Sequence, residues 1–308
     1  TEIAEASGLI GLDVVNPATG RKYRVVYNPG TAAADYTPNL GWTGPVRIHQ
    51  SGERHRPDWL PDPSGPLVST YLTSDKVLSI QPKAHVVFEQ SISIIKADNT
   101  NSLDQSSSWT NSPLIDGGIA TWDSTVTSGN ATTIGNGKNL AGIALANPAG
   151  NVTINSGASG LLALGSAGIN ASSSIRTLAL TSSVRLDAPQ SWITGSSGAT
   201  GSTQISASAV ISGPGGLAIS AVDNRGVALT GANTFAGGLT LGSGTILDYS
   251  TASAVLAADG GVTSSPFGTG PLTVNGGTLN AGNRNFFNPS VAINGDFTWS
   301  TTSTRGRR

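Results

Sequence analysis

The sequence predicts an all-β protein, most of which is a solenoid of short stacked strands. Three observations lead to this prediction. Short apolar pairs recur through the second half of the chain, clusters of Gly, Asn, Pro, Ser and Thr separate them, and the intervals are about 10 to 20 residues. Strands this short cannot bury one face alone, so they must repeat and stack about 5 Å apart. Stacking gives one continuous aliphatic core.

Residues 1–96 are expected to form a separate β-rich region used for capping, anchoring or assembly. The first 100 residues carry 9 Lys/Arg, 10 Asp/Glu and all three histidines, so charge is concentrated there. Strand-like segments at 9–15 and 22–27 flank the turn Asn16–Gly20, which suits a hairpin. Further strands that would complete a small antiparallel sheet are expected at 47–50, 67–72, 76–80 and 85–95.

The rest of the chain is predicted to be a linker, a solenoid and a tail. Residues 97–117 are polar and rich in Asn and Ser, and indicate a linker or a first irregular coil. Residues 118–300 are assigned to the β-helix and 301–308 to a basic tail. At about 20 residues per turn, we expect nine or ten turns. The coils before Val210 are expected at 119–126, 140–145, 152–154, 161–164, 178–186, 192–193 and 205–211.

The run GVALTGANTFAGGLTLGSGTI, residues 226–246, resembles the autotransporter-associated β-strand repeat, also called the passenger-associated transport repeat. Its usual form is close to L-x-G-x-N-T-Y-x-G-G-T-x-x-x-x-G-T-L, and Leu239 departs from it. The matching residues are Leu229, Gly231, Asn233, Thr234, Phe235 (for Tyr), Gly237, Gly238, Gly244, Thr245 and Ile246 (for Leu). The resemblance covers about residues 122–299. It implies a right-handed parallel β-helix on a secreted or surface-displayed bacterial protein, with no chemistry in the repeat itself.

Composition excludes several functional classes. Only 11% of residues are charged and the formal net charge is −1, so we expect no nucleic-acid partner. Cysteine is absent, which excludes disulfides, thiolate metal sites and a cysteine nucleophile. No apolar run approaches 18 residues, so no membrane-spanning helix is expected. Methionine is absent and the chain begins at Thr1, which fits a trimmed, exported protein.

Trp42, His49, His55 and Trp59 are candidate partner-contact residues in the first region. His49, Glu53, His55 and Asp58 lie near one another in sequence, but their spacing matches no recognisable metal site, and the neighbouring Arg54 and Arg56 would repel a cation. We therefore expect no metal and no cofactor. Trp42 and Trp59 beside prolines suit a sugar-stacking platform, and they suit equally well the core of a small sheet domain.

Phe297 and Trp299 are the candidate partner-contact residues at the other end, in a chain with few aromatics. They suit either a cap on the solenoid or a docking face.

Enzymatic chemistry is not expected. Glu is absent after Glu89 and the aspartates are thinly spread, whereas polysaccharide-cleaving enzymes need paired carboxylates. We expect a non-enzymatic, exported structural protein at the bacterial cell surface: a subunit of a surface layer or filament, or an adhesin-like passenger. Its partners would be further copies of itself or other surface proteins. The alternatives are a glycan- or host-surface-binding module, a viral fibre, and a carbohydrate-active β-helix enzyme.

Overall fold

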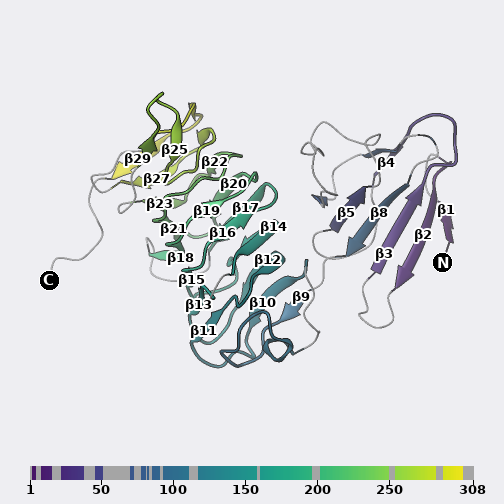
Figure 1. Ribbon diagram of the computed structural model, residues 1–308, viewed down its shortest axis with the longest axis horizontal. Helices are drawn as coiled ribbons and strands as arrows, with labels where there is room; N and C mark the ends of the chain where they lie inside the picture. The colour runs from purple at the N-terminus through teal and green to yellow at the C-terminus, as the bar shows by residue number, and fades with distance from the viewer. Residues whose placement is uncertain are drawn as a thin grey trace. The chain divides into compact units, whose positions relative to one another are not determined.

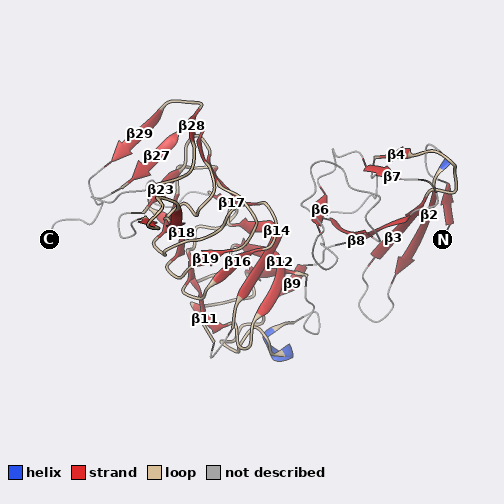
Figure 2. Ribbon diagram, turned by 45° about the horizontal axis from the view of Figure 1, so that its top comes forward, coloured by secondary structure: helices blue, strands red, loops and turns tan. Residues whose placement is uncertain are grey.

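The computed structural model describes residues 2–4, 8–15, 22–37, 46–50, 70–72, 78–80, 82, 85–90, 93–110, 117–157, 160–195, 202–249, 254–281 and 287–300 (Figure 1). Its elements are almost all strands, with short helical turns such as η2 (Ser106–Ser108) (Figure 2). The chain divides into two compact units, Thr1–Ile92 and Ser93–Arg308. The all-β fold class predicted from composition and periodicity is confirmed.

The first unit is built on an antiparallel sheet with the strand order β1-β2-β3-β8-β5-β6, accompanied by the antiparallel pair β4·β7. The predicted hairpin is present, with Ile10 opposite Tyr27 in the β2·β3 register. Val26, Val86 and Phe88 are fully buried in a small core, and the Phe88 ring lies 5.4 Å from that of Tyr36. The strands are β1 (Glu2–Ala4), β2 (Ile10–Val15), β3 (Lys22–Tyr27), β4 (Ala34–Tyr36), β5 (Val46–Gln50), β6 (Thr70–Leu72), β7 (Leu78–Ile80) and β8 (His85–Gln90).

The second unit is a β-solenoid of parallel stacked strands. One sheet runs β9-β10-β12-β14-β17-β20-β22-β26-β28 with β16 and β19 branching from β14, and a second runs β11-β13-β15-β18-β21-β23-β27-β29. Figure 1 shows the strands of successive turns lying side by side. We call each turn a rung.

The first sheet contains β9 (Ser93–Ile95), β10 (Ile119–Asp123), β12 (Lys138–Ala146), β14 (Leu162–Asn170), β16 (Val184–Leu186), β17 (Gln190–Thr194), β19 (Ile211–Ser212), β20 (Leu217–Ala221), β22 (Leu239–Leu241), β26 (Leu272–Val274) and β28 (Val291–Ile293). The second contains β11 (Asn130–Thr133), β13 (Val152–Asn155), β15 (Leu178–Leu180), β18 (Thr203–Ala207), β21 (Gly226–Leu229), β23 (Ile246–Asp248), β27 (Gly277–Asn280) and β29 (Phe297–Ser300). A hairpin of β24 (Val255–Leu256) and β25 (Val262–Ser264) projects between β23 and β26.

Inward-facing side chains form continuous columns, because parallel pairing in register places equivalent residues above one another. One column crosses every rung of the first sheet: Ile94, Ala120, Ile143, Ile169, Trp192, Ile219, Leu241, Val274 and Ile293. Its members are buried down to Val274, which is 1% exposed, whereas Ile293 is 59% exposed. A column in the second sheet contains Asn130, Val152, Leu178, Ile205, Val227, Leu247, Leu279 and Trp299.

The rungs are longer than the sequence predicted, and about eight are complete instead of nine or ten. Successive members of the first column are 19 to 33 residues apart; β9 adds a ninth strand to the first sheet, while the second sheet has eight. The longest interval, from Leu241 to Val274, contains the β24·β25 hairpin. Eight rungs at about 4.8 Å give a solenoid of about 34 Å between its first and last strands. The single strand expected at 85–95 is also wrong, since β8 pairs with β3 and β5 while β9 pairs with β10.

The run at 226–246 supplies the devices that connect one rung to the next. Leu229 and Phe235 are fully buried in the core. The fully buried Asn233 accepts a hydrogen bond from the Ile211 N–H at 2.8 Å and donates one to the Pro266 carbonyl at 2.8 Å, so it ties three successive rungs together. Gly238 has φ of +83°, and a Cβ there would lie 2.5 Å from the Pro271 carbonyl oxygen. These residues hold corners and carry no reactive group.

Candidate assembly surfaces

The first end of the solenoid is closed by residues 96–110. Leu103 is fully buried, and its N–H donates to the Thr133 carbonyl at 2.7 Å, so this segment lies over the first rung of the second sheet. Asn130, which begins the inward column there, accepts a hydrogen bond from Trp122 Nε1 at 2.9 Å and donates one to the Asn99 carbonyl at 2.7 Å. The column therefore ends in a polar group with its hydrogen bonds made. We call residues 96–110 the plug.

Lys96 is the cation within the plug. Its side chain is fully buried, and Nζ donates to the Ala97 carbonyl at 3.0 Å, the Asn99 carbonyl at 2.6 Å and Asn99 Oδ1 at 2.9 Å. Burial lowers the pKa of Lys96 to about 8, and the charge of Asp98 opposes that shift. Three oxygen acceptors match the three donors of an ammonium group. Lys96 therefore organises the plug from within.

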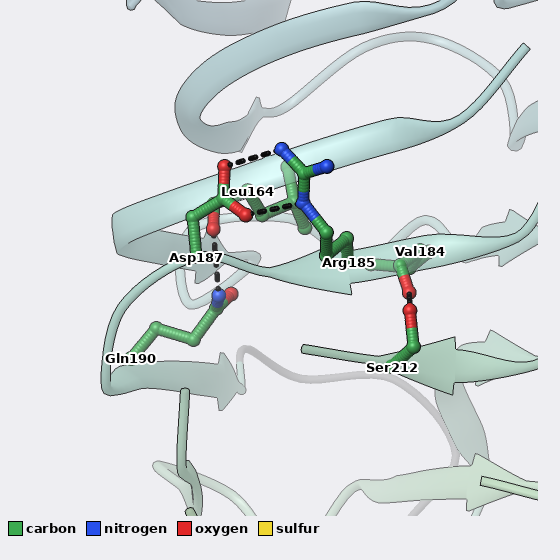
Figure 3. A network of polar contacts seen from close by, with 6 residues as sticks. All are labelled: Leu164, Val184, Arg185, Asp187, Gln190 and Ser212. Carbon is green, nitrogen blue, oxygen red and sulfur yellow. Dashed lines mark hydrogen bonds and ion pairs between the residues drawn. The ribbon is translucent and has the colours of Figure 1, made fainter. Parts of the chain in front are cut away.

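Polar contacts along the side of the solenoid connect successive rungs (Figure 3). Gln190 Nε2 donates to the Leu164 carbonyl at 3.2 Å, and Ser212 Oγ donates to the Val184 carbonyl at 3.3 Å. Arg185 Nε donates to Asp187 Oδ1 at 2.5 Å, which raises the pKa of Arg185. Both members of this ion pair are more than 40% exposed, so solvent screens it and it holds little free energy.

The last end of the solenoid has no equivalent of the plug among the described residues. Val291 and Ile293 on β28 are 49% and 59% exposed, and Trp299 on β29 is 45% exposed. These residues stand over Leu272, Val274 and Leu279, each 1% exposed. The Trp299 ring makes an edge contact with Tyr249, their centroids 6.4 Å apart. The last rung therefore has the chemistry of the core and the exposure of a surface.

Of the residues predicted as partner contacts, two lie together in this last rung. Phe297 and Trp299 occupy alternate positions of β29, over Gly277 and Leu279, and Phe297 is half-buried. His49 lies on β5, where its backbone is opposite Val87; its side chain lies outside the described residues. Trp42, His55 and Trp59 also lie outside them, as do Glu53 and Asp58.

Val291 and Ile293 were not predicted as contact residues, because only the aromatic side chains stand out in this part of the sequence. The signal was present: Val291 and Ile293 alternate with Ala292 in a strand-like pattern. Val291 and Ile293 are exposed because no rung follows them in the described part of the chain. A local sequence pattern does not show where the stack of rungs stops.

Within the described ranges, no group of three or more His, Asp or Glu side chains is arranged to hold a metal ion. The same residues contain no helix that is both long and apolar enough to cross a membrane. The surfaces that remain are the ends and faces of the solenoid and of the first unit.

Comparison with known proteins adds no assignment to this geometry. No protein-family model, no curated protein and no solved structure matches the chain.

Proposed function

We propose that this protein is a non-enzymatic, exported structural component whose solenoid packs side by side with other copies in a surface layer or filament. The observation that carries the proposal is the outward face of the second sheet. Its outward column across four rungs is small and uncharged: Ala131, Thr153, Ala179 and Ser206; the next member, Ala228, is also small but only 8% exposed. A charge first enters that column at Asp248.

Such a face favours packing against another sheet because little must be desolvated. Side chains of this size project only a short distance from the backbone, so two faces can approach closely, and no charge has to be removed from water. Asn155 and Thr181, beside this column, are also uncharged. Thr181 Oγ1 donates a hydrogen bond to Asn155 Oδ1 at 2.9 Å, so these two polar groups already satisfy one another within the face. A long uncharged face is otherwise unusual on a soluble rod, where mixed charges keep molecules apart.

The first unit offers an independent contact surface. Ile10, Leu12 and Val14 project from the same side of β2 and are 38%, 44% and 43% exposed. A row of exposed aliphatic side chains on a sheet favours contact with another apolar surface. This agrees with the anchoring or assembly role expected for this region. Export to the cell surface is supported by the resemblance at residues 226–246.

Negative-stain electron microscopy of the purified chain over a range of concentrations tests the proposal. We expect rods aligned side by side in ordered arrays. The double substitution Ala179→Lys and Ser206→Lys places two charges on the proposed face and should abolish the arrays. Val222→Lys is the matched control, because Val222 is 65% exposed and lies outside this column. Single particles of the unmodified chain at every concentration would refute lateral assembly.

A further inference from the structure

Among the described residues, nothing pairs with the backbone groups on the outer edge of β28, which are aligned for pairing. Among the described strands, β28 is the terminal strand of its sheet and pairs only with β26. The Leu272 N–H donates to the Ser290 carbonyl at 2.9 Å, and the Asn294 N–H donates to the Val274 carbonyl at 2.8 Å. Alternate residues of a strand direct their polar groups to opposite edges. Val291 and Ile293 therefore direct theirs away from β26.

The same two residues carry the exposed apolar side chains of the last rung. Val291 and Ile293 end two inward columns whose preceding members, Leu272 and Val274, are 1% exposed. A strand added to β28 would pair with its free backbone groups and cover both side chains in one step. Edge strands that do not pair with other chains usually carry lysine, proline or a β-bulge. Neither β28, with the sequence VAI, nor β29, with the sequence FTWS, has any of these.

The first end of another copy is a poor occupant for this edge. It presents the plug, in which Lys96, Asn99 and Asn130 hydrogen-bond one another or nearby backbone groups. Stacking the plug on β28 would place polar groups against Val291 and Ile293. The strand that would meet β28 is β9, the other terminal strand of this sheet, and its Ile95 carbonyl already accepts a hydrogen bond from the Thr110 N–H of the plug at 2.9 Å. Head-to-tail stacking of these solenoids therefore lacks complementarity.

The β28 edge is complementary to itself. A twofold axis perpendicular to the sheet, passing between the Ala292 residues of two copies, makes their β28 strands antiparallel. It places Val291 of each copy opposite Ile293 of the other. These are the residues whose backbone groups point outward, so each opposed pair exchanges both hydrogen bonds. Their side chains lie on the same side of the paired strands, over the two cores. The contact is isologous and closes at two copies.

We propose that two copies of this chain join through antiparallel pairing of their β28 strands, forming a dimer in which the solenoids meet at their last rungs. This proposal rests on the structural role proposed above and names one contact within it. Lateral packing through the second sheet uses other residues, so either contact can exist without the other. In this dimer both plugs face away from the contact, and the outer edge of each β28 strand is paired.

Disulfide trapping tests the pairing directly. The chain has no cysteine, so Ala292→Cys gives each copy a single thiol, on the proposed twofold axis. Ala292 would face its counterpart in a non-hydrogen-bonded antiparallel pair, where Cα atoms lie about 4.5 Å apart. That distance is within the range for a disulfide. We expect rapid formation of a covalent dimer on mild oxidation, and at most slow, collision-limited cross-linking of the exposed control Val222→Cys.

Analytical ultracentrifugation of the full chain measures the equilibrium, in the Ala179→Lys and Ser206→Lys background so that lateral contacts are absent. We expect monomers and dimers whose proportion depends on concentration. Ile293→Lys should weaken dimerisation at least tenfold, and Val222→Lys should leave it unchanged. Circular dichroism of each variant confirms that the β fold is retained. Position 293 is already 59% exposed, so the substitution should not unfold the solenoid.

Three results would overturn the proposal: monomers at all concentrations, dimers insensitive to Ile293→Lys, or oligomers larger than dimers that Ile293→Lys removes. Ordered arrays in microscopy that persist with Ile293→Lys, together with the first result, would leave the structural role intact and remove only the β28 contact. Conversely, a β28 dimer without arrays would remove lateral assembly alone.

Discussion

Asn233 ties three rungs through one buried side chain, and replacing it should destabilise the solenoid strongly. Its Oδ1 accepts from the Ile211 N–H and its Nδ2 donates to the Pro266 carbonyl, both at 2.8 Å, with no exposed surface. Asn233→Ala removes both hydrogen bonds and leaves the Ile211 N–H and the Pro266 carbonyl buried without these partners. Each such group costs about 1 to 3 kcal/mol, so the expected loss in free energy of unfolding for the two groups is about 2 to 6 kcal/mol.

Asn233→Asp separates hydrogen bonding from shape. An ionised carboxylate still accepts from the Ile211 N–H but places a charge against the Pro266 carbonyl oxygen, whereas a protonated carboxyl group makes both contacts. Burial and this carbonyl should raise the pKa of the introduced carboxyl group in the folded state above its unfolded value of about 3.9. The variant should therefore approach the stability of the unmodified chain below about pH 4 and lose stability as pH rises from there to the folded pKa.

Urea unfolding followed by circular dichroism at several pH values measures both effects. Asn139 provides matched controls, because it is exposed on β12 and no side-chain hydrogen bond is described for it. Asn139→Ala and Asn139→Asp should change the free energy of unfolding by less than about 0.5 kcal/mol, without the pH dependence. If Asn233→Asp were as stable as the unmodified chain at pH 7, Asn233 would not hold the rungs together in the way described.

Three further predictions concern the core, the plug and the first unit. Ile219→Ala should cost about 2 to 5 kcal/mol in chemical unfolding, and Ile293→Ala at the open end of the same column should cost under about 1 kcal/mol; equal losses would contradict the burial gradient. The pKa of Lys96 is lowered to about 8 in the folded chain, so the folded chain loses this proton at a lower pH than the unfolded chain does. The free energy of unfolding should therefore rise between pH 8 and 10.5 relative to that of Lys96→Met. If the two variants changed in parallel with pH, Lys96 would not have the lowered pKa. Asp13 accepts a hydrogen bond from Arg24 at 2.6 Å, which lowers the pKa of Asp13. The contribution of this pair to the free energy of unfolding, on the order of 1 kcal/mol, should therefore be lost as pH falls below about 4. Asp13→Asn should remove this acid sensitivity in thermal unfolding.

Much of the solenoid follows from local patterns. The apolar pairs at 152–154, 178–180 and 272–274 all become strands with inward-facing side chains. They could be predicted because strand side chains alternate with a period of two and the intervening Gly, Asn and Ser residues suit corners. The antiparallel hairpin of the first unit was likewise predictable from two alternating segments around a turn.

The candidate surfaces were less accessible to sequence reasoning. Phe297 and Trp299 were identified because aromatics are scarce, whereas Val291 and Ile293 look like any other inward pair. The plug was also hidden: Lys96, Asn99 and Asn130 look solvated in sequence, and only the fold shows that they close an end of the solenoid.

The sequence by itself determined that the chain is all-β, which side chains of most strands face inward, and that the repeat residues serve corners, because alternation and turn chemistry act over a few residues. Only the tertiary structure decided that β8 and β9 belong to different units, how long each rung is, and which end is closed. The physical reason is that rungs pair residues 19 to 33 positions apart across corners of variable length, so register depends on three-dimensional closure that no short segment encodes.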